Sequence, residues 1–334
     1  MKHFVPFTAS KIEAYLPKRF DLTIEADLER EDLSPTFAEK IEICSDPTHW
    51  DQIEADYVIV GIPEDIGVRA NMGRPGAGDA FKNFLQVFLR QPHNVHNDAS
   101  RFCLLGTVQT ADLMTEAENL DNSIHEDRIQ LSNLVMMLDK RVSEVVYSIK
   151  QSNKTPIFIG GGHNNCYSVL RTYGYSKPVD CINIDAHTDL RVSKGRHSGN
   201  GFSHAIENDF LNNYFMIGIH EQSLTAAMIE KINTSPNIVY AALGTDLDLS
   251  VKNALNHIDR SHYGLEIDLD VISNFPSSAQ SPVGLNLEEV SNVILELQNN
   301  TSPLYYHFCE GAPVYGYNNQ VGKALTYLIN SLGI

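Results

Sequence analysis

The sequence predicts an α/β fold with a mostly parallel sheet covered by helices on both faces. Runs of β-branched residues that end at glycine or proline alternate along the chain with segments of helical periodicity. The first clear strand lies at 56–63, and the longest helix carries apolar residues three and four positions apart over 131–149. Because parallel neighbours must be joined by crossover connections, this alternation favours a parallel sheet.

The remaining elements follow the same two patterns. Further strands are predicted at 101–108, 155–159, 181–184, 214–220 and 237–243, and within 262–272 and 303–313. Further helices are predicted at 79–89, 225–232 and 318–332, and in the second half of 277–297.

The chain is expected to form a single domain over residues 1–334, because it shows no internal repeat and no low-complexity linker. Residues 1–54 are polar and rich in Asp, Glu and Pro. They are predicted to be an N-terminal lead-in with one or two short helices.

Composition and charge narrow the class of partner. The chain has 334 residues, of which 43% are hydrophobic, and its formal net charge is −17. Such acidity argues against nucleic acid or an anionic membrane as a partner. No apolar stretch approaches about 18 residues and no secretory leader is recognisable, so a cytoplasmic protein is expected. Five scattered cysteines fit reduced thiols.

A candidate metal site directly follows the strand at 181–184. Asp185, His187 and Asp189 occupy alternate positions, which lie on one face of an extended chain. Open α/β sheets bind their ligands just beyond the carboxyl ends of the strands. Carboxylate oxygens combined with imidazole suit manganese, iron or zinc. The segment therefore predicts a metal centre.

Two further strand ends carry residues of the same kind. His163 follows three glycines after the strand at 155–159, and Asp268 and Asp270 form a second acidic pair. The six side chains suit two cations about 3.5–4 Å apart that share carboxylates. Two such cations lower the pKa of a bridging water. Because no Ser-His-Asp or Cys-His arrangement stands out, the site indicates a hydrolase.

Polar loop residues are candidates for substrate contacts. Arg69, Asn71 and Arg74 lie in a glycine-rich loop that lacks the GxGxxG and P-loop patterns, and they can reach an anionic group. Ser198 and Asn200 lie in a loop expected at the same edge of the sheet. Surface positions without a function are the alternative interpretation.

Three motifs together resemble the ureohydrolases, a family that includes arginase, agmatinase and formimidoylglutamase. They are GGGH at 160–163, DAHTD at 185–189 and DLD at 268–270, and the resemblance covers roughly residues 55–330. It implies a three-layer αβα, arginase-like fold with about eight parallel strands, and two Mn²⁺ per chain. It also suggests a homo-oligomer, often a trimer or a hexamer.

The resemblance also implies a role for each ligand. Asp185 and Asp268 would bridge the two metals, His163 and Asp189 would complete one site, and His187 and Asp270 would complete the other. Asp189 would in addition relay a proton to the leaving amine.

Within the family, the chain most resembles the formimidoylglutamases. The loop at 67–77, the GGGH motif and Arg191 carry this likeness. It implies hydrolysis of N-formimidoyl-L-glutamate to L-glutamate and formamide, a step of histidine breakdown. Arg69, Arg74 and Arg191 offer cations for the anionic end of this substrate.

Other features leave alternatives open. Glu289 aligns with the family's acid for a guanidinium group, and the SGN sequence at 198–200 matches that of arginases. The histidine that arginases carry shortly afterwards is replaced by Phe202, so His204 is the candidate catalytic histidine. The alternatives are a guanidino hydrolase of arginase or agmatinase type that releases urea, a non-catalytic metal-binding relative, and a single-zinc deacetylase of the same fold.

Overall fold

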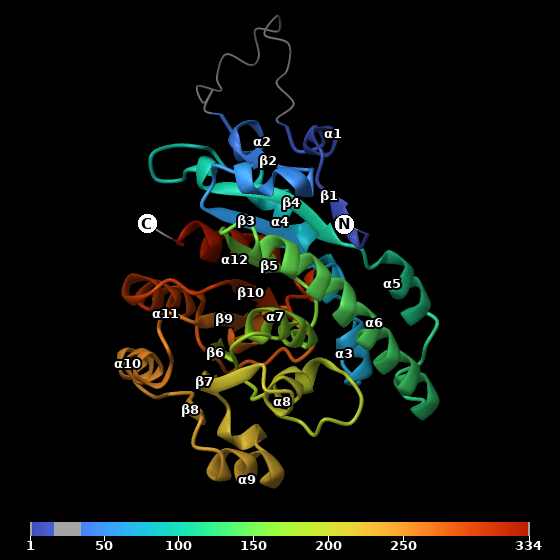
Figure 1. Ribbon diagram of the computed structural model, residues 1–334, viewed down its shortest axis with the longest axis vertical. Helices are drawn as coiled ribbons and strands as arrows, with labels where there is room; N and C mark the ends of the chain where they lie inside the picture. The colour runs from blue at the N-terminus through green and yellow to red at the C-terminus, as the bar shows by residue number, and fades with distance from the viewer. Residues whose placement is uncertain (1, 17–34, 333–334) are drawn as a thin grey trace, which may run out of the picture.

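A mixed ten-stranded sheet forms the centre of the computed structural model, which describes residues 2–16 and 35–332 (Figure 1). The strands are β1 (Phe4–Pro6), β2 (Glu42–Ile43), β3 (Tyr57–Gly61), β4 (Phe102–Val108), β5 (Thr155–Ile159), β6 (Val179–Ile184), β7 (Leu211–Ile219), β8 (Ile238–Ala242), β9 (Tyr263–Asp268) and β10 (Tyr306–Cys309). Eight of these described strands run parallel in the order β4-β3-β5-β10-β9-β6-β7-β8. This arrangement confirms the predicted parallel sheet.

The N-terminal segment extends the sheet rather than merely leading into it. β1 pairs antiparallel with the end of β4, and β2 pairs parallel with its beginning. Two short helices, α1 (Ala9–Ile12) and α2 (Phe37–Lys40), match the expectation for this part of the chain. The two strands were not predicted, because three-residue and two-residue strands leave no measurable alternation in a sequence. The rest of the lead-in, residues 17–34, lies outside the described residues.

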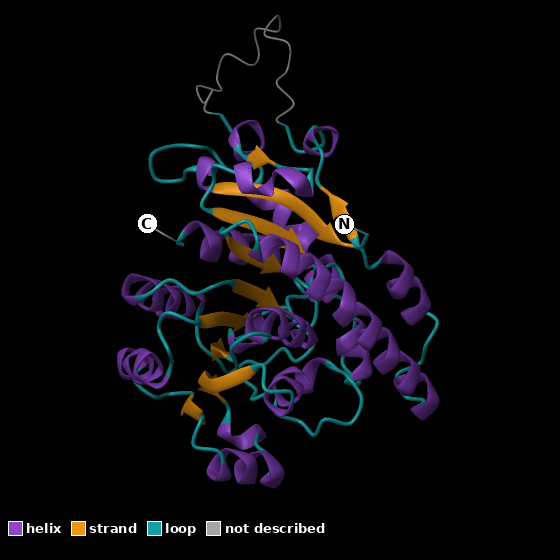
Figure 2. Ribbon diagram, in the orientation of Figure 1, coloured by secondary structure: helices purple, strands orange, loops and turns teal. Residues whose placement is uncertain are grey.

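Helices cover both faces of the sheet, as Figure 2 shows. The remaining helices are α3 (Ile66–Ala70), α4 (Ala80–Phe88), α5 (Ala111–Ala117), α6 (His125–Lys150), α7 (Cys166–Gly174), α8 (Gly201–Glu207), α9 (Ala226–Thr234), α10 (Leu247–His257), α11 (Leu287–Asn300) and α12 (Gln320–Asn330). Apolar residues of α4, α10, α11 and α12 form one buried cluster with the sheet. Those of α5, α6, α7 and α8 form a second cluster. Ile59 of β3 belongs to the first cluster and its neighbours Val58 and Val60 to the second, so the two clusters lie on opposite faces. The three-layer expectation is confirmed.

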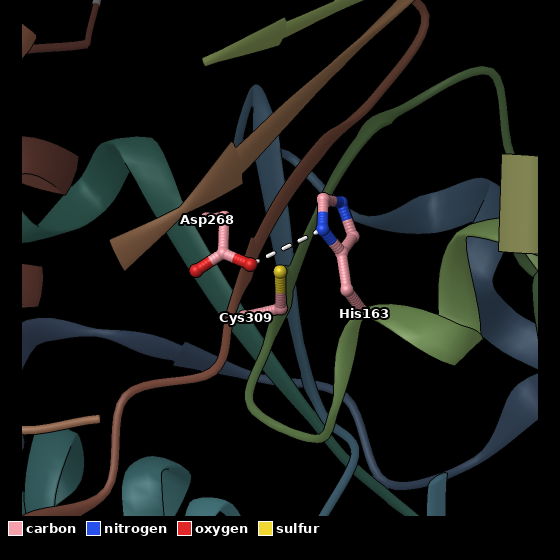
Figure 3. Close-up of side chains that lie close together, drawn as sticks. All are labelled: His163, Asp268 and Cys309. Carbon is pink, nitrogen blue, oxygen red and sulfur yellow. Dashed lines mark ion pairs between the residues drawn. The ribbon is translucent and has the colours of Figure 1, made fainter. Parts of the chain in front are cut away.

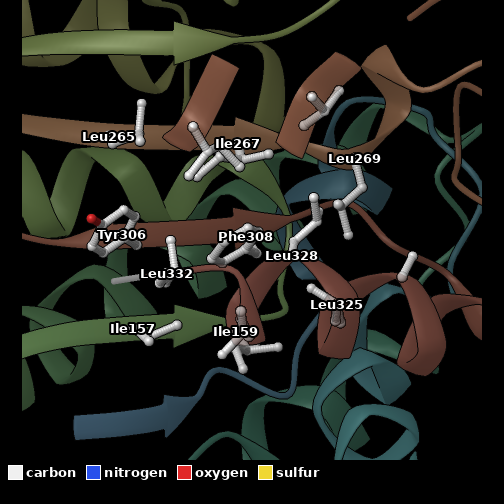
Figure 4. Close-up of a cluster of buried hydrophobic side chains, with 14 of the residues drawn as sticks. Ile157, Ile159, Leu265, Ile267, Leu269, Tyr306, Phe308, Leu325, Leu328 and Leu332 are labelled. Atoms are coloured by element: carbon white, nitrogen blue, oxygen red, sulfur yellow. The ribbon is translucent and has the colours of Figure 1, made fainter. Parts of the chain in front are cut away.

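The packing of α12 stabilises β5, which leads to His163, and its neighbour β10. Leu325 and Leu328 of this helix lie over Phe308 of β10 and Ile159 of β5, and all four side chains are buried (Figure 4). Apolar burial of this kind contributes roughly 1.5–3 kcal/mol per side chain. The central strands are therefore firmly fixed just before their carboxyl ends.

Several helices were not predicted. α3 lies inside the glycine-rich loop, α8 occupies a segment expected to be a loop, and α5, α7 and α10 were also missed. Helices this short gain most of their stability from tertiary packing rather than from intrinsic propensity, so their sequences show only weak periodicity. In the described part of the chain, no helix is long and apolar enough to cross a bilayer.

Candidate metal centre

Three strands, β5, β6 and β9, bring the predicted ligands to one edge of the sheet, and β10 lies between β5 and β9. β5, β10, β9 and β6 lie side by side in that order. His163 follows β5, Asp185 follows β6, and Asp268 is the last residue of β9. Because the strands are parallel, their carboxyl ends meet at the same edge.

The first group of ligands surrounds His163. Its Nδ1 atom lies 3.3 Å from Asp185 Oδ2, 3.0 Å from Asp189 Oδ2 and 3.2 Å from Asp268 Oδ2. One ligand atom from each of these four residues lies within 4.8 Å of every other. The imidazole is almost completely buried, whereas Asp189 is partly exposed.

The second group surrounds His187. Its Nδ1 atom lies 3.2 Å from Asp270 Oδ2 and 3.7 Å from Asp185 Oδ1. Asp185 therefore belongs to both groups, with one carboxylate oxygen turned toward each histidine. The structure thus brings all six predicted ligands together in two adjoining groups.

The donor set fits divalent cations. Among the described residues, the four aspartates form ion pairs only with His163 and His187. Burial, together with the carboxylates of Asp270 and Asp185, raises the pKa of Asp268 well above its usual value. Asp270 Oδ1 is buried without a hydrogen-bond partner. Uncompensated buried charge of this density is costly, and bound cations would remove the repulsion.

A buried thiol lies beside the first group. Figure 3 shows Cys309, the last residue of β10, next to His163 and Asp268. Burial raises the pKa of this thiol well above its usual value, and its Sγ atom donates to the carbonyl of Ile267 at 3.7 Å. Its Sγ atom lies within ligand distance of His163 and Asp268, but manganese prefers oxygen and nitrogen to sulfur, so the surrounding carboxylates are the better ligands.

The backbone around His163 is held by a buried carboxylate that the sequence reasoning missed. Glu64 accepts hydrogen bonds from Gly162 N at 2.9 Å, Ile66 N at 2.7 Å and Asn165 Nδ2 at 2.6 Å. Gly161 has a φ of +78°, and a Cβ atom there would lie 2.8 Å from Glu64 Oε1. A glycine is therefore required at position 161, beside this anchor.

A pocket of about 250 Å³ opens above the metal ligands. Three of the predicted substrate residues, Asn71, Arg191 and Ser198, line it together with His187. Asn71 donates from Nδ2 to Ser198 Oγ at 3.2 Å and accepts from Arg191 Nη1 at 3.1 Å. These side chains form a polar wall from loops far apart in the sequence.

The structure does not place the other two predicted arginines in this pocket. Arg69 pairs through Nε with Asp65 Oδ1 at 2.6 Å. Arg74 donates to the carbonyls of Ser277 and Ser278 at 3.0 and 3.1 Å. Arg69 is paired with the residue before its own helix, Arg74 is bonded to a loop distant in the sequence, and neither lines the pocket, so the predicted contacts of Arg69 and Arg74 with substrate are corrected.

Asn200 and His204 also differ from expectation. The amide of Asn200 is buried, accepts from Arg196 Nη1 at 3.1 Å and donates to Gly195 O at 3.1 Å. His204 Nε2 lies 2.8 Å from the same Gly195 carbonyl. Both side chains stabilise the loop before α8 and neither lines the pocket, so His204 has no contact with the candidate site.

The predicted role of Glu289 is wrong, and another glutamate lies in the pocket. Glu289 closes the N-terminus of α11, where Asn286 N donates to its carboxylate at 2.7 Å and Asn286 Oδ1 accepts from Glu289 N at 2.9 Å. Glu310 lines the pocket and accepts from His163 N at 2.9 Å. Burial raises the pKa of Glu310 to about 8. The available signal was its position directly after β10, where an acid follows a strand as Asp185 does.

Fold and site together define a class: an α/β protein with a candidate dinuclear metal centre at the carboxyl edge of a parallel sheet. The profile of the Arginase family matches residues 55–333. The chain therefore belongs to the Arginase family.

Individual relatives agree with this assignment. The chain is 24% identical to a formimidoylglutamase of Geobacillus sp. (strain WCH70) over 330 residues, which is 95% of each chain. A crystal structure of Trypanosoma cruzi formiminoglutamase with Mn²⁺ is similar with a TM-score of 0.69 at 20% identity, covering 90% of this chain and 97% of that one. The formimidoylglutamase structure from Bacillus subtilis is similar with a TM-score of 0.70 at 13% identity, covering 97% of both chains.

Replacing one clustered carboxylate should separate repulsion from cation binding. In the presence of a chelator, we expect the free energy of unfolding of Asp268→Asn to be at least as large as that of wild type, because the substitution relieves repulsion between carboxylates. With free Mn²⁺ at about 1,000 times its Kd, the free energy of unfolding of wild type should rise by about 4 kcal/mol, and that of the variant by much less. Urea unfolding with and without Mn²⁺ measures both quantities.

Glu289→Ala is the matched control, because it also removes one carboxylate. Loss of the Glu289 half of the capping box should lower the free energy of unfolding by the same small amount in either condition and leave the gain from Mn²⁺ unchanged. An equal gain from Mn²⁺ in Asp268→Asn and wild type would show that the cluster is not the cation site.

Proposed function

We propose that the protein is a formimidoylglutamase, a dinuclear-metal hydrolase that converts N-formimidoyl-L-glutamate and water to L-glutamate and formamide. The observation that carries the proposal is the pair of ligand groups sharing Asp185 beneath a pocket that Arg191 lines. Membership of the Arginase family and the similarity to formimidoylglutamases over nearly the whole chain support it.

The six ligands would hold two Mn²⁺. His163 and Asp189 would complete one site, and His187 and Asp270 the other, with Asp185 and Asp268 shared between them. The position of Asp185 between the two histidines supports its shared role. When bound, the two cations supply a water of lowered pKa, which makes hydroxide available at neutral pH.

The pocket would orient the substrate over this cluster. Arg191 offers a guanidinium group suited to bidentate contact with a substrate carboxylate. Asn71 and Ser198 add amide and hydroxyl groups to the same wall. Glu310, which also lines the pocket, offers a carboxyl group to hydrogen-bond the formimino nitrogen atoms. The planar formimino carbon would thereby face the metal ligands.

Asp189 would move the proton that the reaction requires. Its carboxylate lines the pocket and also lies 3.0 Å from His163 Nδ1. The proton would pass to the glutamate nitrogen as the C–N bond breaks, and formamide and L-glutamate would leave.

We also propose that residues 1–334 act as one domain, because a single sheet takes strands from residue 4 to residue 309. A cytoplasmic location is proposed as well: the five cysteines are free, and four of them are buried. A homo-oligomer stays a prediction.

The direct test is product analysis. Purified protein incubated with Mn²⁺ and N-formimidoyl-L-glutamate should release formamide and L-glutamate in equal amounts, and a chelator should abolish the reaction. Arginine and agmatine serve as parallel substrates. Urea from either of them, without formamide from the first substrate, would assign a guanidino hydrolase. Binding of Mn²⁺ with no turnover of any substrate would indicate a non-catalytic relative.

The substrate's carboxylates provide a second test. Arg191→Met should lower kcat/KM for N-formimidoyl-L-glutamate by roughly 10- to 100-fold, mainly through KM, because it removes a charge-assisted contact made before and during the reaction. Arg74→Met is the matched control, since Arg74 is also exposed and is bonded to Ser277 and Ser278. Equal effects of the two substitutions on KM would exclude Arg191 as the substrate contact.

A further inference from the structure

A buried polar network lies behind the metal ligands, on the side of His163 away from the pocket. Glu266 of β9 accepts a hydrogen bond from Tyr305 OH to Oε1 at 2.8 Å. Its Oε2 atom lies 2.6 Å from Nδ1 of His307 on β10. Glu266, Tyr305 and His307 are all inaccessible to solvent. We call these three residues the Glu266 network.

The network reaches the ligand His163. The Nε2 atom of His163 lies 3.5 Å from Glu266 Oε2, while its Nδ1 atom faces the aspartates of the first ligand group. Within the described residues, His163 Nε2 has no hydrogen-bond partner. The imidazole therefore lies between the candidate cation site on one side and Glu266 on the other.

Packing alone does not explain why a charged side chain occupies this buried position in the sheet. Glu266 and His307 are directly opposite each other in the β9–β10 register. Their strand neighbours Leu265, Ile267 and Phe308 are apolar and pack into the core on the opposite face. A buried carboxylate–imidazole pair gives little net stability compared with apolar side chains. The pair therefore calls for a purpose other than stability.

Fixing the tautomer of His163 is such a purpose. A neutral imidazole that gives its Nδ1 lone pair to a cation carries its proton on Nε2. In a buried site this N–H needs an acceptor, and Glu266 Oε2 is the carboxylate oxygen in reach. A carboxylate in this position fixes the ring and makes the other nitrogen a better ligand.

We propose that Glu266 is a positioning residue for the metal centre: it accepts the Nε2 proton of His163 and so orients Nδ1 toward the cation held with Asp189. Tyr305 and His307 hold the carboxylate in place. The inference rests on the metal centre of the proposed function, but not on the identity of the substrate.

The test is Mn²⁺ binding to Glu266→Gln, measured by the EPR signal of free Mn²⁺ during titration. Wild type should bind two Mn²⁺. The variant should bind one of them about 10- to 100-fold more weakly, with the other less affected. Circular dichroism confirms that the variant is folded at the titration temperature.

Asp180→Asn is the matched control for loss of a buried sheet carboxylate. Asp180 lies near the amino end of β6, away from the ligands at the carboxyl ends of the strands. It accepts hydrogen bonds from Asn213 N at 3.0 Å and Asn212 Nδ2 at 3.1 Å. This variant should be less stable than wild type but bind both Mn²⁺ with unchanged affinity. A structural role for Glu266 alone would give the same result in both variants.

Tyr305→Phe decides the question if Glu266→Gln does not fold. It removes a single hydrogen-bond donor to Glu266 and should lower the affinity for one of the two Mn²⁺ ions by about fivefold. Unchanged affinity for both Mn²⁺ in the folded variant, or an equal loss in Asp180→Asn, would overturn the inference. Wild-type protein that binds no Mn²⁺ would instead contradict the proposed metal centre itself, and this inference with it.

Discussion

The convergence of four aspartates at one edge of a parallel sheet is the constraint on which the site depends. Asp185, Asp189, Asp268 and Asp270 approach two imidazoles, and no lysine or arginine among the described residues pairs with them. Carboxylates gathered in a buried space repel one another and resist desolvation. Divalent cations resolve this conflict, and the same cations can activate water. The chemistry proposed for the protein thus follows from the need to balance charge.

The surrounding fold holds this unfavourable arrangement in place. Apolar clusters on both faces pack against the strands, and the candidate ligands lie at or just beyond the carboxyl ends of those strands. Buried carboxylates on either side then bind the backbone or the rings: Glu64 and Glu310 accept main-chain N–H groups beside His163, and Glu266 lies behind its imidazole. The metal centre is therefore enclosed by a second set of acids.

Short-range patterns in the sequence were sufficient to predict the parallel sheet and the convergence of the six candidate ligands. Alternation after a strand end is a local property, and parallel strands carry such ends to one edge. The substrate contacts could not be read in this way, because a loop arginine takes whichever partner the tertiary structure provides. Arg74 bonds the distant carbonyl groups of Ser277 and Ser278. Arg69 pairs with Asp65 four residues earlier, a spacing that becomes informative only once helix α3 is recognised. For Glu289, the Asn-x-x-Glu spacing of a helix cap was present in the sequence and was the better guide.

The central claim is that these six side chains surround two cations. Crystals grown with Mn²⁺ and measured at the manganese absorption edge would locate every bound ion by its anomalous scattering. The account predicts two peaks on either side of Asp185, one beside His163 and one beside His187. A single peak, or ions bound away from these histidines, would contradict it.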